Sequence, residues 1–212
     1  MDDAQFDAAL IAAGLQLAAD QGWRAVSVAA AARAANLPMG RARERFPGRS
    51  AILLRFGRAA DQLALTEPPG DGPVRDRLFD LLMRRIDAFQ AQRAGVLALL
   101  RGLPADPPTA LLLALATRRS MRWMLEATGL STSGIRGELR VKGLVAVWLW
   151  TVRAWQADGS EDLSATMAAL DTALRRAEQA AEGLCWSRRP AQAPAVPDAG
   201  PEPIEPLPDA SP

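Results

Sequence analysis

The chain has 212 residues, 49% of them apolar, and a formal net charge of +1, so its overall charge points to neither a polyanionic nor a polycationic partner. It has no histidine and one cysteine, Cys185, which excludes Ser/His/Asp and Cys/His nucleophilic sites, an internal disulfide and a thiolate metal cluster. No pair of carboxylate residues has a spacing that would indicate acid–base catalysis. We therefore expect no enzyme, no catalytic or metal-binding residues and no cofactor.

The sequence also lacks the signals of export and of membrane insertion. Its N-terminus is acidic and has no basic segment of the kind that begins a signal peptide. The uncharged apolar segment 143–152 is only ten residues long, whereas a membrane span needs about 20. We expect a cytoplasmic protein with no stable membrane span.

The first 65 residues are typical of a small helical domain. Apolar residues recur every three or four positions on one face of the first helix, at Phe6, Leu10, Ala13 and Leu17. Gly22 should end that helix, and the Ser27 hydroxyl should cap the next one. Asn36 tolerates the left-handed backbone of a tight turn, and Pro38 suits the first turn of a third helix. These signals predict helices over 4–20, 28–34, 38–46 and 49–65.

Residues 66–73, "TEPPGDGP", are rich in turn-forming residues and predict a linker between two domains, 1–65 and 74–186. From residue 187 to the end, eight of 26 residues are proline and no helical periodicity remains, which predicts a disordered tail over 187–212. Alanine, leucine and arginine dominate the segment between, and no stretch alternates as a strand would. Its predicted helices cover 74–92, 94–102, 108–128, 135–157 and 161–184.

Two of these C-terminal helices have distinctive patterns. In 161–184, apolar residues follow a heptad-like seam that includes Leu163, Met167, Leu170 and Leu174. The seam packs either within the subunit or, as we predict, across a homodimer interface. The helix at 135–157 is apolar nearly all round and should be buried on several sides. Its tryptophans are either core residues or part of an apolar ligand site, for which the candidates are Trp123, Met124, Trp148 and Trp150.

Three short helices followed by a longer one form a helix-turn-helix plan. The segment "ALIAAGLQLAADQGWRAVSVAAAARAANLPMGRARERFPGRSAIL", residues 9–53, resembles the DNA-binding domain of the TetR family of transcriptional regulators through Gly22, Ser27, Gly40, Phe46 and Arg49. The resemblance implies an all-α homodimer whose third helices enter the major groove of a double-stranded DNA operator. It also implies a C-terminal domain that dimerises and binds an apolar small-molecule or lipid effector.

The sequence departs from that family where its third helix normally meets DNA. Pro38 replaces the usual serine, and Arg43 replaces the usual tyrosine that contacts phosphate. Residues 41–58 nevertheless contain six arginines and one acidic residue, a local charge of +5 that suits phosphate binding. Because Arg41 and Arg45 are four residues apart, we expect both to face the groove. Arg43, Arg49 and the Ser27 hydroxyl are expected to contact phosphates.

The segment from Gly72 onward also resembles lipid-binding accessory proteins of ubiquinone biosynthesis. The resemblance lies in "GPVRDRLFDLLMRRIDAF" (72–89) and "RVKGLVAVWLWTVRAWQADGSEDLSATMAALDTALRR" (140–176), with Arg140, Lys142, Trp155, Asp158, Ser160, Thr166, Leu170 and Asp171 at the matching positions. It implies the same fold, an isoprenoid ligand and no need for DNA. The arginine-rich third helix favours a TetR-type regulator, most simply a repressor. The lipid-binding accessory protein is the alternative.

Overall fold

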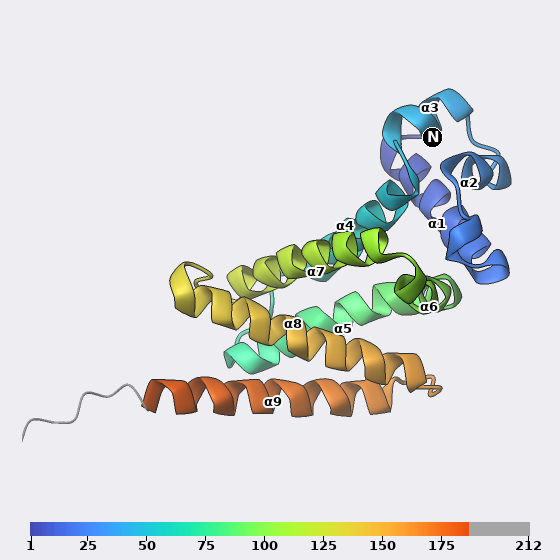
Figure 1. The fold of residues 1–212 in the computed structure, drawn as a ribbon. Helices are drawn as coiled ribbons and strands as arrows, with labels where there is room; N and C mark the ends of the chain where they lie inside the picture. Colours follow the sequence, from blue (N-terminus) through green and yellow to red (C-terminus); the bar gives the residue numbers. More distant parts are fainter. Residues whose placement is uncertain (187–212) are drawn as a thin grey trace, which may run out of the picture.

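The computed structural model describes residues 1–186, and every regular element in that part of the chain is a helix (Figure 1). The predicted all-α fold, with an N-terminal helix-turn-helix unit and a larger C-terminal helical unit, is confirmed. The tail predicted for 187–212 lies outside the described residues. No helix in the described part is long and apolar enough to cross a membrane.

The N-terminal unit contains α1 (Asp3–Gln21), a short 3₁₀ turn η1 (Trp23–Ala25), α2 (Val28–Ala34), α3 (Met39–Arg45) and the beginning of α4 (Arg49–Leu65). Asp2 and Gln5 form a capping box at the start of α1, and Ser27 Oγ accepts a hydrogen bond from the Ala30 amide at the start of α2. Asn36 has a positive φ of 52°, so the predicted left-handed turn between α2 and α3 is confirmed. Pro38 precedes α3 instead of lying in its first turn.

The C-terminal unit contains five further α-helices and one 3₁₀ turn. In Figure 1, α9 runs along α8 on the side away from the N-terminal unit, and α7 lies between α4 and α8. The elements are α5 (Val74–Gln90), α6 (Arg93–Gly102), η2 (Leu103–Ala105), α7 (Pro107–Ala127), α8 (Gly134–Ala157) and α9 (Ser164–Trp186).

Two hydrophobic cores meet along α4 and α6, and the non-helical segment 66–73 only links α4 to α5. Ile52 and Leu53, near the start of α4, are buried in the N-terminal core, whereas Ala64 at its end is buried in the C-terminal core. Helix α6 likewise contributes Leu99 to the N-terminal core and Val96 to the C-terminal one. The two units are therefore joined by helices that belong to both cores.

Helix α6 approaches α1 closely because residue 95 is a glycine. A Cβ atom on Gly95 would lie 2.4 Å from the backbone oxygen of Leu15, which is far inside van der Waals contact. Any larger residue would push α6 away from α1. The backbone of the N-terminal unit is thus held directly against the C-terminal unit.

The leucine seam of α9 packs inside the protomer. Leu163, Leu170 and Leu174 are each at most 5% exposed and belong to the C-terminal core, where α9 packs on α8 and α5. Met167, the fourth seam residue, is half-buried beside Phe79 of α5. The prediction that this seam pairs across a dimer is therefore wrong, since its leucines have no surface left for a second chain.

A hydrogen-bonded turn makes α9 begin at Ser164, three residues later than predicted. The Asp158 carboxylate accepts bonds from the amide and hydroxyl of Ser160 and from those of Thr166. Leu163 adopts a positive φ of 55° between them, where a leucine is uncommon. Asp158, Ser160 and Thr166, three of the positions behind the second family resemblance, thus have a structural role at the α8–α9 corner.

We expect the Asp158 turn to make folding sensitive to acid. The hydroxyls of Ser160 and Thr166, which donate to its ionised form, hold the pKa of Asp158 far below its usual value. A depressed folded-state pKa stabilises the fold above the unfolded-state pKa near 4, and this contribution is lost as pH falls toward the folded-state pKa. Asp158→Asn should lower the melting temperature at pH 7 and flatten its decline between pH 5 and pH 3.

Thermal unfolding followed by circular dichroism across this pH range provides the measurement. Ser160→Ala is the matched control, because it removes one donor and keeps both bonds from Thr166, and it should give an intermediate slope. An Asp158→Asn protein with the wild-type slope would show that other carboxylates control the acid transition.

Candidate functional site

The arginines of α3 divide between two faces of the helix. Arg41 and Arg45 share a face, as their spacing predicts, but that face is turned toward α1. Arg41 donates to the Asp3 carboxylate and its guanidinium carbon lies 4.5 Å from the centroid of the Phe6 ring. Arg45 donates from Nε to Asp7 Oδ1 at 2.6 Å and also pairs with Asp3. The two side chains that were expected to face the groove are thus held by acidic residues of α1.

A third arginine completes this acid–base cluster between α1, α3 and α4. Arg55 donates to Asp7 and to the backbone oxygen of Arg45. The hydrogen bond from Arg45 holds the pKa of Asp7 below its usual value and raises the pKa of Arg45 itself, so both remain charged. Three arginines against Asp3 and Asp7 leave the cluster with a charge of only +1, and it clamps α3 to α1.

The outward face of α3 belongs to Met39, Gly40, Arg43 and Glu44, all of which are exposed. Arg43 forms no ion pair with any residue of the described chain. It stands where the helix-turn-helix plan presents side chains to a groove, because it lies opposite the face that packs on α1. Of the three α3 arginines, Arg43 is the one that the fold leaves available.

Ser27 and Arg49 lie at the ends of neighbouring helices. Ser27 is exposed and uses an oxygen lone pair for its cap, which leaves the hydroxyl proton available to another acceptor. Arg49 donates to Asp106 Oδ2 at 2.8 Å, and Asp106 also accepts from the hydroxyl of Thr109 as the N-cap of α7. This ion pair connects the start of α4 with the start of α7.

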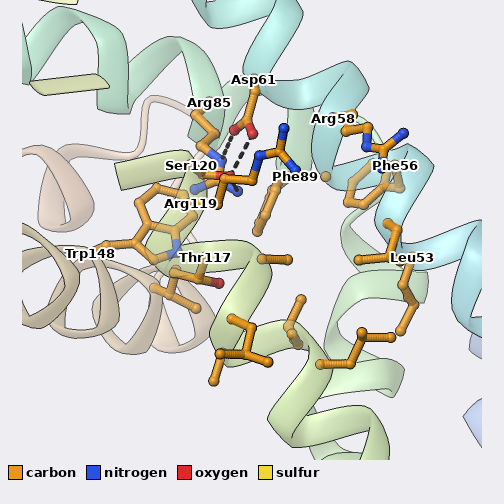
Figure 2. Close-up of a pocket in the computed structure, with 18 of the residues that line it drawn as sticks. Leu53, Phe56, Arg58, Asp61, Arg85, Phe89, Thr117, Arg119, Ser120 and Trp148 are labelled. Carbon is orange, nitrogen blue, oxygen red and sulfur yellow. Dashed lines mark hydrogen bonds and ion pairs between the residues drawn. The ribbon is translucent and has the colours of Figure 1, made fainter. Parts of the chain in front are cut away.

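A cavity of about 770 Å³ lies between α4, α5, α6, α7 and α8 (Figure 2). Its wall is mostly apolar, and its size is within the range of small-molecule sites in proteins. Two of the predicted ligand-binding residues, Trp123 and Trp148, line it. Met124 is fully buried in the core, and Trp150 is exposed on the outer surface of α8; neither lines this cavity.

The polar end of this cavity was not predicted from the sequence. Figure 2 shows Arg85 of α5, Asp61 of α4 and Ser120 of α7 together above Trp148. Arg85 Nε lies 3.0 Å from Asp61 Oδ1, and the Ser120 hydroxyl donates to Asp61 Oδ2. The guanidinium carbon of Arg85 lies 4.5 Å from the Trp148 ring centroid. A detectable signal was Arg85 itself, because it interrupts the apolar face of 74–92 at a position that should be buried.

Burial sets the electrostatics of this cluster. Arg85 is 3% exposed, and its Nη1 atom has no hydrogen-bond partner among the described residues. Burial lowers the pKa of Arg85 and raises the pKa of Asp61, while the charge of Arg85 and the bond from Ser120 oppose the shift of Asp61. Asp61 thus forms an ion pair with Arg85 and accepts one hydrogen bond, from Ser120. No group of histidine, cysteine and carboxylate side chains in the described part of the chain could hold a metal ion.

Comparisons with known proteins identify the fold. A TetR transcriptional regulator from Nitrosomonas europaea matches with a TM-score of 0.67 and 22% identity, over 82% of this chain and 99% of that one. A tetR-family regulator from Streptomyces coelicolor matches with a TM-score of 0.60 and 22% identity, over 87% and 85%. A TetR regulator from Rhodococcus sp. RHA1 matches with a TM-score of 0.55 and 16% identity, over 84% and 97%.

The sequence itself has no comparable match. No protein-family model matches it, and a comparison with curated proteins found no significant match. Identities of 16–22% show a shared architecture. The chain therefore has the all-α fold of TetR-type transcriptional regulators.

We expect the buried pair of Arg85 and Asp61 to be strongly coupled. Arg85→Met leaves a carboxylate without its cation and should lower the free energy of unfolding by about 3 kcal/mol. The double variant Arg85→Met/Asp61→Leu should lose less than the sum of the two single variants, because no unpaired charge remains buried. Urea unfolding of the four proteins measures this coupling, and additive losses would contradict it.

Proposed function

We propose that this protein is a TetR-type DNA-binding transcriptional regulator, acting as a repressor whose DNA affinity is controlled by an apolar ligand. The observation that carries the proposal is the outer face of α3 on a helix-turn-helix unit with the TetR-type fold. On this face Arg43 is exposed and forms no ion pair with any described residue. Arginine is the residue that most often makes a bidentate contact with guanine in the major groove. Glu44, exposed beside it, can accept a hydrogen bond from cytosine.

The other predicted DNA-binding residues take supporting roles in this proposal. Ser27 donates its hydroxyl proton to a phosphate at the start of α2. Arg41 and Arg45 hold α3 in place through their ion pairs with Asp3 and Asp7. Arg49 connects the helix-turn-helix unit to the start of α7 through its ion pair with Asp106. In this proposal Arg43 carries sequence selectivity, because no acidic side chain of residues 1–186 holds its guanidinium.

The protein would read an operator as a homodimer. The leucines of the α9 seam are buried inside the protomer, so we propose the outer face of α8 as the dimer interface. The exposed apolar side chains on this face are Ile135, Leu139, Leu149 and Trp150. Exposed apolar side chains grouped on one helix are typical of an interaction surface. Two copies joined there would present two α3 helices to successive major grooves.

Helix α4 supplies the connection between ligand and DNA. Ile52 packs in the N-terminal core, while Phe56 and Asp61 line the cavity about one turn and about two and a half turns further along the helix. A ligand that fits the cavity in only one orientation of α4 shifts the population toward that orientation. The two α3 helices then no longer match the spacing of the grooves, and the operator is released.

A second candidate function is that of a lipid-binding accessory protein that does not bind DNA, with an isoprenoid in the same cavity. It is favoured by the pairing of Arg41, Arg45 and Arg55 with Asp3 and Asp7, which offsets two of the five positive charges counted in the sequence. The regulator ranks first because Arg43 remains exposed and unpaired among the described residues. DNA binding separates the two candidates.

A salt-dependent gel shift with DNA from upstream of the protein's own gene tests the proposed function. Arg43→Ala should weaken specific binding at least tenfold and leave the melting temperature within about a degree of wild type, because Arg43 has no ion-pair partner in the part of the chain that the structure describes. Arg176→Ala, an exposed arginine of α9, is the control and should bind like wild type. The accessory role would be supported by two results together: no DNA fragment binds the protein above the non-specific level, and an isoprenoid lipid co-purifies with it.

The proposed interface predicts the effect of a charge on α8. Trp150→Glu should convert the dimer to monomers in analytical ultracentrifugation without loss of helical content, since Trp150 is 54% exposed in the protomer. Leu111→Glu places the same charge on an exposed site of α7 and should leave the dimer intact. If the Trp150→Glu protein still sediments as a dimer, the outer face of α8 is not the dimer interface.

A further inference from the structure

The charges that line the cavity are unbalanced. Its charged lining residues are Arg58, Asp61, Arg85 and Arg119, three cations and one anion. Asp61 is already bound to Arg85 and Ser120, and neither Arg58 nor Arg119 forms an ion pair or hydrogen bond with any described side chain. Two guanidinium groups on the wall of one largely apolar cavity are therefore left without a counter-charge from this part of the protein.

These two arginines lie at the open side of the cavity. Both are exposed, Arg58 on α4 and Arg119 on the facing helix α7, and Figure 2 shows them on the same side of the cavity as Asp61. Leu115 and Trp123, four residues before and after Arg119, also line the cavity and are more than half exposed. The mouth thus combines apolar side chains with two cations.

We propose that the ligand of this cavity is an amphipathic carboxylate, whose single anionic head binds Arg58 and Arg119 and whose apolar body lies inside. This inference rests on the proposed function in so far as the cavity is the effector site. Guanidinium groups bind carboxylates through paired, charge-assisted hydrogen bonds, which are stronger than neutral ones. The wall of Leu, Phe, Val and Trp side chains supplies no further charge for a second anionic group.

The Asp61–Arg85 pair makes Arg85 a poorer partner for the anionic head than Arg58 and Arg119. Arg85 is the deeper cation, but the neighbouring Asp61 carboxylate repels an incoming anion, and Arg85 is packed against the rings of Trp148 and Phe89. A carboxylate head therefore gains more from the unpaired guanidinium groups of Arg58 and Arg119 than from Arg85. The tail, which needs no polar partner, fills the interior between α4, α7 and α8.

Direct binding to the purified full chain tests this assignment. Dodecanoate and dodecanol, which share one apolar body and differ in the head, are titrated below micelle formation by calorimetry. The quenching of tryptophan fluorescence is followed in parallel, because Trp123 and Trp148 line the cavity. We expect dodecanoate to bind at least about tenfold more tightly than dodecanol.

The variant Arg58→Gln/Arg119→Gln should remove this preference, so that the two ligands bind equally. Both side chains are exposed, and the substitution should leave the melting temperature nearly unchanged. Arg136→Gln, at an exposed arginine of α8 outside the cavity, is the control for a general loss of positive charge and should keep the preference.

Three results would overturn the inference. These are equal binding of the acid and the alcohol to wild type, a preference that survives in the double variant, and binding of neither probe. A neutral isoprenoid alcohol that binds where dodecanoate does not would assign the cavity to neutral lipids. Because these titrations contain no DNA, their outcome is independent of the gel shift: a chain that binds dodecanoate and no operator would refute the regulator while supporting the carboxylate site.

Discussion

The central constraint on this structure is that one helix, α4, is buried in two cores. Its first turns, with Ile52 and Leu53, complete the N-terminal core, and its last turn, with Ala64, belongs to the C-terminal core. The stretch between them lines the cavity. Because a helix is stiff over this length, its two ends cannot change orientation independently of each other.

Further contacts join the two units. Gly95 lets the backbone of α6 touch α1 at Leu15, and the Arg49–Asp106 ion pair joins the start of α4 to the start of α7. Leu99 of α6 extends the N-terminal core across the boundary. The segment 66–73, which the sequence suggests as the division between domains, takes part in neither core, so it is a connection rather than a hinge around which the units separate.

The arginines of this protein fall into two groups: those that form ion pairs with acidic residues of the fold, and those that form none with the described residues. Arg41, Arg45 and Arg55 are held by Asp3 and Asp7, and Arg85 is held by Asp61. Arg43 on α3 and the pair at the cavity mouth lack such acids among the described side chains. In a chain whose basic residues are nearly all arginine, composition cannot reveal this difference, because each pair joins residues far apart in sequence.

The sequence by itself determined the helices, because apolar periodicity, the Ser27 cap and the Asn36 turn act within a few residues of one another. The fold class and the helix-turn-helix unit follow from those local signals. Only the tertiary structure decided which face of each helix is used. The α9 leucines are buried inside the protomer. Arg41 and Arg45 pair with acidic residues of α1, whereas Arg43 is exposed. Arg85 forms an ion pair with Asp61 beside the cavity. Periodicity states that residues share a face, but what that face meets depends on contacts between distant parts of the chain.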